Sequence, residues 1–120
     1  ENVLGELGTG MEVAQNAFMS ARLGLGAISL GGMKRVAQLM HRYATRRTIA
    51  TGRLLDNPVT VIHFSNLAAA ITAIETLVAV IAEFLERKIS VPEEVFITCK
   101  ISGSEFLWQA ADNLVQLLGG

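Results

Sequence analysis

The sequence has a single cysteine and almost no net charge, and each of these shortages excludes a class of structure or function. A single cysteine, Cys99, excludes a disulfide within the chain and fits a reducing compartment or an indifferent one. We expect a cytoplasmic location. The net charge of −1 gives no bulk attraction to nucleic acid. His41 and His63 lie far apart, and no cysteine stands at ligand spacing from them, so we expect no metal site. No Ser-His-Asp grouping, phosphate loop or glycine-rich dinucleotide motif is visible either.

The stretch from Met11 to Thr51 contains no proline and predicts one long helix, with a weak point at Gly31-Gly32. Its apolar line steps by three and four residues through Leu23, Gly26, Leu30, Met33, Ala37, Met40 and Ala44. A second line holds the small residues Ala17, Ser20, Gly24, Ala27 and Gly31. A helix with two such lines is expected to be wrapped by other helices, and the small residues allow close backbone approach.

Two further helices are predicted by their start signals. Asn57-Pro58 combines a capping side chain with proline at the first helical position, and the helix should run from Pro58 to about Lys88. Its seam has heptad spacing through Leu67, Ile71, Ile74, Val78, Ile81 and Leu85. Ser90 to Glu93 resembles a capping box, so a third helix is expected from Val91 to Leu118. Its expected inner stripe is Phe96, Cys99, Gly103, Phe106, Ala110, Asn113 or Leu114, and Leu117.

The connections are short, so the fold class is all-α, an up-down bundle of three long helices. Residues 1–10 form a lead-in segment, and residues 11–120 form the bundle. So much apolar surface calls for a fourth helix, which makes this an incomplete four-helix bundle and suggests a piece of a longer protein. The piece should therefore expose a large apolar face and self-associate. A membrane span is not expected, because Glu75 and Glu83 interrupt the apolar run of the second helix.

Arg22 is the unusual residue of the first helix, because it lies among small and apolar residues. It must find a carboxylate, a phosphate or water. A structural ion pair with Glu12, or with a residue outside this chain, is one interpretation, and a ligand contact is the other. Phe106 and Trp108 are predicted to lie in the core, and Glu105 on the surface unless it acts as an acid. The arginines near the end of the first helix either hold a pyrophosphate or form a solvated helix end; they are Arg42, Arg46, Arg47 and Arg53.

Several motifs, read together, resemble the C-terminal helical domain of the acyl-CoA dehydrogenase family. The opening residues, 2–5 and 8–10, are similar to the family's lead-in from its β-domain. Tyr43-Ala44 with Arg47 is similar to the end of its first long helix. The other matching residues are Ala17, Phe18 and Arg22 in the first helix, and Lys100, Ser104, Glu105 and Gln116–Gly120 in the third. The resemblance covers essentially the whole chain, and it depends on the order and spacing of the motifs.

The resemblance implies FAD as cofactor, acyl-CoA or another acyl thioester as substrate, and α,β-dehydrogenation as the reaction. It also implies a homodimer or tetramer, and an electron-transferring flavoprotein that re-oxidises the reduced flavin. By position, Arg47 would contact the FAD pyrophosphate of a neighbouring subunit. Gln116, Gly119 and Gly120 would lie against the adenosine part, where glycine permits close approach.

On the substrate side, the resemblance implies that Phe18 lines the acyl-CoA channel and that Arg22 lies near the catalytic carboxylate. Most members of the family carry that carboxylate downstream of the position of Gly120. A minority carry it just before the arginine, where this sequence has Ala21. We therefore expect no catalytic residue within this chain.

The sequence departs from the family in two places. Ala50-Thr51 stands where the family has Phe-Gly, and no glutamine occurs between Val59 and Phe64. Three hypotheses follow. The chain is a fragment of an FAD-dependent acyl-CoA dehydrogenase that supplies part of the FAD and acyl-CoA sites and of the subunit interface. Alternatively, it is a redox-inactive oligomerisation or binding module derived from that family, or an unrelated self-associating bundle.

Overall fold

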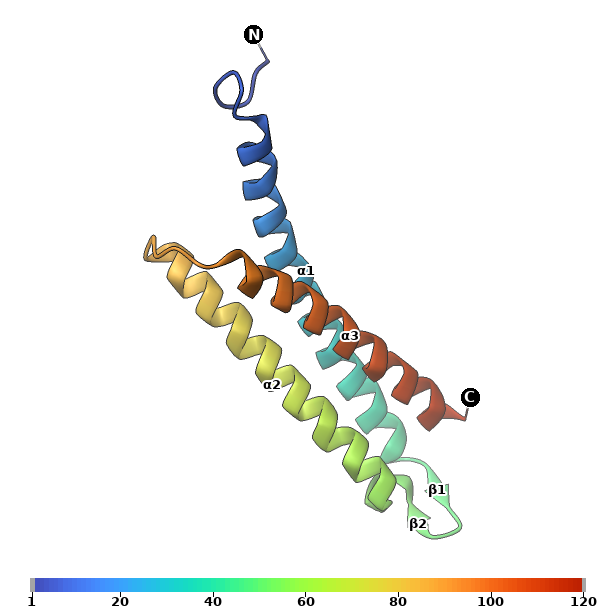
Figure 1. Ribbon diagram of the computed structural model, residues 1–120. Coiled ribbons are helices and arrows are strands. Elements are labelled where there is room, and N and C mark those ends of the chain that lie inside the picture. Colours follow the sequence, from blue (N-terminus) through green and yellow to red (C-terminus); the bar gives the residue numbers. More distant parts are fainter. Residues whose placement is uncertain (1, 120) are drawn as a thin grey trace.

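The computed structural model describes residues 2–119 as three long helices and a small hairpin. Along the chain these are α1 (Gly10–Ala44), β1 (Thr48–Ile49), β2 (Gly52–Arg53), the 3-10 helix η1 (Leu54–Asp56), α2 (Pro58–Glu86) and α3 (Glu93–Leu118). The helices run up, down and up, so α1 and α3 point the same way (Figure 1). The molecule measures 68 × 27 × 18 Å, and the first turns of α1 project beyond the other helices (Figure 1). The predicted all-α up-down bundle is confirmed.

The inner face of α1 is the apolar line that the sequence predicts. Gly26, Met33, Met40 and Ala44 are buried. The helix continues through Gly31-Gly32, so the predicted weak point is wrong; Gly32 packs against Leu107 of α3, which supports the helix there. The second line of small residues is exposed apart from a half-buried Gly24. The expectation that α1 is wrapped on both lines is therefore wrong within residues 2–119, because α2 and α3 cover only one side of it.

The predicted end of the first helix is also wrong, because α1 ends at Ala44 rather than Thr51. The Thr45 hydroxyl lies within hydrogen-bond distance of two carbonyl oxygens, those of His41 (2.9 Å) and Arg42 (3.1 Å), and its one proton caps the last turn. The β-branched Thr48 and Ile49 then pair with Arg53 and Gly52 in an antiparallel hairpin. Gly52 has φ +117°, a left-handed conformation that glycine adopts without strain.

Helix α2 begins as predicted, with the Asn57 side chain accepting a hydrogen bond of 3.0 Å from the Val59 amide. It ends two residues earlier than predicted, because Lys88 takes the left-handed conformation with φ 56°. The amide of Ile89 then donates to the carbonyl oxygen of Phe84 at 2.8 Å, as at many helix ends. By length and composition, α2 is the one helix within residues 2–119 that is apolar enough to cross a membrane, and 17% of that stretch is buried. Its carboxylate Glu75 pairs with Lys34 of α1.

The predicted capping box of the third helix is wrong. α3 begins at Glu93, and Pro92 precedes it in an extended conformation with no side-chain cap. A residue before proline is disfavoured in the helical region, which disfavours a helix start at Val91. The inner stripe of α3 is confirmed, with Phe96, Cys99, Gly103 and Ala110 buried. The helix stops where Gly119 adopts φ 110°.

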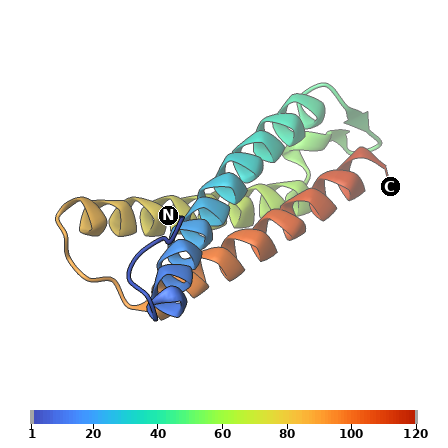
Figure 2. The ribbon, with the colours of Figure 1, turned by 90° about the horizontal axis from the view of Figure 1, so that it is seen from above.

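Helices α1 and α3 approach most closely where small residues face each other. A Cβ added to Gly103 would lie 3.3 Å from the Cα of Gly26, and one added to Gly26 would lie 2.3 Å from the Cys99 sulfur. Figure 2 shows the three helices side by side, with the hairpin and the C-terminus at one end and the α2–α3 connection at the other. The predicted close backbone approach is therefore real, but it uses Gly26 of the apolar line rather than the second line of small residues.

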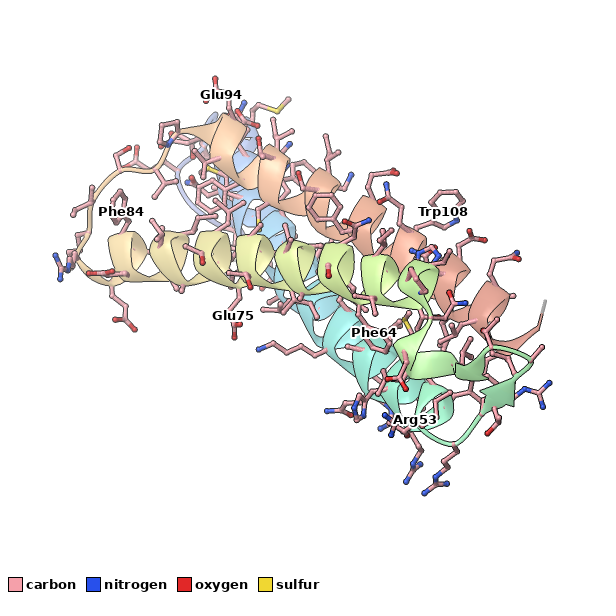
Figure 3. All side chains as sticks on the ribbon, turned by 90° about the horizontal axis from the view of Figure 1, so that it is seen from below. Arg53, Phe64, Glu75, Phe84, Glu94 and Trp108 are labelled. Atoms are coloured by element: carbon pink, nitrogen blue, oxygen red, sulfur yellow. The ribbon has the colours of Figure 1, made fainter. Side chains whose placement is uncertain are left out.

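The core lies between the three helices in two clusters. One centres on Met33, Met40, Leu67 and Ile74, and the other on Ile81, Phe96 and Cys99. Phe106 packs on the first cluster as expected, but Trp108 is 67% exposed, so its predicted core position is wrong. Trp108 projects from α3 on the side away from α2 (Figure 3).

Candidate functional site

The two residues assigned to the substrate lie together on α1. Phe18 and Arg22 line a hollow of about 320 Å³ with Ala21, Leu25 and Lys100. We call it the Phe18 hollow. One turn of helix separates Phe18 from Arg22, so both face the same side, and α3 contributes the ammonium group of Lys100. The hollow thus combines an apolar wall with cationic groups, which suits a ligand with an apolar chain and an anionic or polar head.

Arg22 has a protein partner at this hollow. Its guanidinium donates to the Glu93 carboxylate in the first turn of α3 at 2.5 Å. The side chains are 26% and 50% exposed, so the pair is only partly desolvated. The expected pairing with Glu12 is wrong, because Glu93 is the carboxylate that α3 brings to Arg22. Arg22 does form an ion pair, as that interpretation expected, but Glu93 of this chain is neither of the two partners that it named. A ligand at Arg22 must share the guanidinium with Glu93.

The residues assigned to the cofactor lie at the opposite end of the bundle. Arg47 follows α1, and its backbone is held on both sides. Its amide donates to the Tyr43 carbonyl oxygen at 3.0 Å, and its own carbonyl oxygen accepts from Leu54 at 2.9 Å. The side chain is exposed, and it makes no ion pair with any carboxylate in residues 2–119. A fixed backbone with a free guanidinium suits the binding of an external anion.

Gln116 lines a second hollow, of about 250 Å³, which we call the Gln116 hollow. It lies between α3, η1 and the start of α2. Its polar groups are His63, Asn113, Asn57 and the buried Thr60, and its other lining residues are Leu54, Val59 and Leu117. Sequence reasoning missed His63 and Asn113 as site residues. The one available signal was Asn113, a polar residue at an otherwise apolar stripe position of α3.

Gly119 ends α3 in the left-handed conformation, and a Cβ added there would meet nothing within 4 Å. The backbone at this point is therefore open to a ligand. Gly120 was assigned to the same site and lies outside the described residues. Ala50-Thr51 forms the tip of the hairpin between β1 and β2. The hairpin tip thus carries Ala50 and Thr51 at the position where the resemblance to the family implies a phenylalanine followed by glycine.

The two groups of candidate residues are far apart. Arg22 and Ala44 lie on one continuous helix, so roughly 33 Å of helix separates them at 1.5 Å per residue. Phe18 and Arg22 share one hollow, whereas Gln116 shares a hollow with Leu54 of η1, and Arg47 lies between α1 and β1. Figure 1 shows the hairpin and the C-terminal end of α3 at the end of the bundle away from the start of α1. Within residues 2–119, no group of three or more His, Cys, Asp and Glu side chains is placed to hold a metal ion.

Comparison with known proteins bears on the whole chain. The family model for the acyl-CoA dehydrogenase C-terminal domain matches residues 8–120. The very long-chain specific acyl-CoA dehydrogenase of mitochondria from Rattus norvegicus is 28% identical over 120 residues, which cover 100% of this chain and 18% of that protein. The corresponding proteins of Mus musculus and Homo sapiens are 28% and 25% identical over the same coverage. The chain thus spans 18% of the length of these relatives.

Proposed function

The chain belongs to the acyl-CoA dehydrogenase family, and on that premise we propose that it supplies part of the FAD site and part of the acyl thioester site of an FAD-dependent acyl-CoA dehydrogenase. The observation that carries the proposal is the arrangement of the matched residues. The family motifs fall on one bundle as two separate groups, one beside an apolar hollow and one at an open helix end. An unrelated self-associating bundle would not match the family model from residue 8 to residue 120.

The hairpin end fits a flavin dinucleotide. The free guanidinium of Arg47 offers two parallel N–H donors to a pyrophosphate, and the polar groups of the Gln116 hollow suit the adenosine part. The open backbone at Gly119 permits close approach of that part. When bound, FAD accepts the hydride that leaves the β-carbon of the acyl group. The task of this chain at that end is to bind and orient the dinucleotide.

The Phe18 hollow fits the substrate side. Phe18 and Leu25 present apolar surface to an acyl chain, and Lys100 offers a cation to the polar head. A carboxylate base must remove the α-proton, but the position before Arg22 is Ala21. Glu93 already accepts from Arg22. We therefore assign no catalytic base to this chain, and its residues here bind and position the thioester.

The separation of the two groups favours an oligomer. With roughly 33 Å of helix between them, one copy of the domain is better placed to serve two active centres than one. Arg47 and Gln116 would then reach the flavin of a neighbouring subunit, in a homodimer or tetramer. Re-oxidation by an electron-transferring flavoprotein completes the proposed cycle. The cytoplasmic location remains a prediction. The names of the relatives state a mitochondrial location for those proteins.

The test uses the complete protein that carries this domain, under anaerobic conditions. We expect a visible flavin band that bleaches on addition of one member of a panel of acyl-CoA thioesters. The variant Arg47→Ala should lose flavin by about 10- to 100-fold in affinity, because a hydrogen bond to a charged group contributes about 1.5–3 kcal/mol. Arg47→Lys should retain part of the affinity, because it keeps the positive charge but loses the two parallel N–H donors of the guanidinium. A protein that holds FAD and is reduced by no acyl thioester would refute the dehydrogenase proposal.

The second candidate function is a redox-inactive oligomerisation or binding module. Ala50-Thr51 at the hairpin tip and the missing glutamine in α2 favour it, because both remove expected contacts to the flavin. A complete protein that stays colourless with added FAD, and still self-associates, would establish it. A carboxylate base downstream of Gly120 would count against it.

A further inference from the structure

The Gln116 hollow is polar but carries no charged side chain. It measures about 250 Å³, and none of the residues that line it is Asp, Glu, Lys or Arg. Four of its polar residues make no side-chain hydrogen bond within residues 2–119: Thr60, His63, Asn113 and Gln116. A hollow with free polar groups and no charge favours a neutral ring that has donors and acceptors of its own over a phosphate group.

His63 lies where α2 can replace the glutamine that the sequence lacks. The resemblance to the family implies a glutamine early in α2, and none occurs between Val59 and Phe64. His63 follows Val59 by four residues on the same side of the helix, and both line the hollow. Val59 offers the hollow only apolar atoms, whereas the half-buried imidazole of His63 offers one donor and one acceptor when neutral. α2 therefore still presents a polar side chain to the hollow, one turn later than expected.

The opposite wall of the hollow belongs to α3 and carries two amides. Asn113 and Gln116 lie three residues apart, so their side chains face the same side of the helix. A side-chain amide donates and accepts at once, which matches the amino group and the adjacent ring nitrogen of adenine. Leu54 and Leu117 add apolar surface for the faces of a flat ring. The lining as a whole suits adenine held between α2 and α3.

A free cation lies beside this uncharged hollow. The carbonyl oxygen of Arg47 accepts from the amide of Leu54 at 2.9 Å, and Leu54 lines the hollow. An adenine nucleotide can therefore place its base in the hollow and its phosphates toward Arg47. Both FAD and CoA contain adenine. The Phe18 hollow, assigned to the acyl group, lies on the far side of the roughly 33 Å of helix that separates Arg22 from Ala44, which favours FAD here.

From this arrangement we propose that His63 is the contact of α2 to the adenine ring of FAD and compensates for the missing glutamine. Asn113 and Gln116 complete the contact from α3. The inference rests on the proposed FAD site and names a residue of this chain that gives the site its specificity for the dinucleotide. The missing glutamine then no longer argues against flavin binding.

The test measures flavin affinity in the complete protein after its flavin has been removed, by equilibrium dialysis with FAD and with FMN, which lacks the adenosine part. His63→Ala should weaken FAD binding by about three- to tenfold, the range expected for one neutral hydrogen bond, and should leave any FMN binding unchanged. His63→Asn should lose less, because an amide also donates and accepts. Val59→Gln added to His63→Ala should restore most of the lost FAD affinity, because the new amide enters the same hollow from the preceding turn.

His41→Ala is the matched control. His41 packs edge to face against Phe64, with ring centroids 6.3 Å apart, and does not line the hollow. This variant should bind FAD as the wild type does.

The outcomes separate this inference from the enzyme proposal. If the wild type binds FAD and His63→Ala binds it equally well, or if Val59→Gln restores nothing, the role of His63 is wrong, while bleaching of the flavin by an acyl thioester still supports the enzyme. An equal loss of FMN affinity would also refute it, because the effect would not concern adenine. If His63→Ala weakens the binding of CoA and not that of FAD, the hollow holds the adenine of the substrate and the assignment to FAD is wrong. If the wild type binds no FAD, both proposals fail.

Discussion

Glycines lie on both the inner and the outer face of α1, but only those on the inner face are packed against another helix. On the inner face, Gly26 is buried where α3 crosses, and no side chain fits beside Cys99. On the outer face, Gly24 and Gly31 have nothing within 4 Å of an added Cβ. A glycine within a helix lowers stability by about 1 kcal/mol relative to alanine. Gly26 offsets that cost by close packing, whereas Gly24 and Gly31 gain nothing from contacts within residues 2–119.

The largest effect is expected for Gly26→Ala. The added Cβ would lie 2.3 Å from the Cys99 sulfur, and overpacking of this kind costs about 1–3 kcal/mol of unfolding free energy. In a Cys99→Ala background the same change should cost less, because the sulfur is gone. Urea denaturation of the four proteins in this cycle measures the coupling. An equal cost in both backgrounds would show that the sulfur does not limit the space at Gly26.

A smaller effect of opposite sign is expected on the outer face. Gly24→Ala and Gly31→Ala should each stabilise the 120-residue chain by about 0.5–1 kcal/mol, because they restrict the unfolded chain and add no clash. The same variants in the complete protein sharpen the comparison. If another segment covers this face there, the sign should reverse. Destabilisation in the 120-residue chain itself would contradict the open space seen beside these glycines.

Gly32→Ala should fall between the two cases, with a change close to zero. An added Cβ would lie 2.8 Å from a methyl carbon of Leu107, the far end of a flexible side chain that can move. The clash is then offset by the gain of about 1 kcal/mol in helix propensity. Leu107→Ala provides the control, since Gly32→Ala should become stabilising once the methyl groups are removed. Thermal unfolding of the single and double variants distinguishes these outcomes.

The last effect depends on pH and concerns Cys99, the thiol buried on the inner side. Burial raises the pKa of this thiol, because the thiolate loses its solvation. The folded state therefore holds its proton more tightly than the unfolded chain, whose thiol has a pKa of about 8.5. The resulting stability is present below that value and is lost as the pH rises toward the raised pKa. The loss of unfolding free energy between neutral and alkaline pH should be smaller in Cys99→Ala.

An Ala27→Cys variant should react with thiol reagents far faster than Cys99, because Ala27 is exposed.

Local periodicity was sufficient to predict most of the fold. The inner stripes of all three helices follow from repeats of three and four residues, except that Leu85 at the end of the predicted α2 seam is 47% exposed. Asn57-Pro58 marks the start of α2 correctly. The failures lie at helix ends, where propensity competes with local hydrogen bonds. Thr45 closes α1 with its hydroxyl, and Pro92 delays α3 by two residues. Trp108 was misplaced because its apolar character was given more weight than its spacing: it lies two residues from both Phe106 and Ala110, and therefore on the side of α3 opposite the inner stripe.

The candidate site was predictable only as an ordered set of motifs. Their order and spacing were enough to suggest the family, which the match over residues 8–120 shows. The Arg22–Glu93 pair joins residues 71 positions apart, and spacing along one helix gives no information about it. The contribution of His63 to the Gln116 hollow depends likewise on how α2 meets α3. Both are tertiary contacts, and no local pattern encodes them.

The unbroken length of α1 has a consequence for how the two candidate sites vary together. This single helix sets both the distance and the relative angle between Phe18, in its first half, and the segment with Arg47, whose amide is bonded to Tyr43 in the last turn. A one-residue insertion between them would move one site by about 1.5 Å and turn it by about 100° about the helix axis. Substitutions within α1 leave this distance and angle unchanged, whereas insertions and deletions change both. The domain should therefore tolerate many residue exchanges in the middle of α1 and almost no insertion or deletion there.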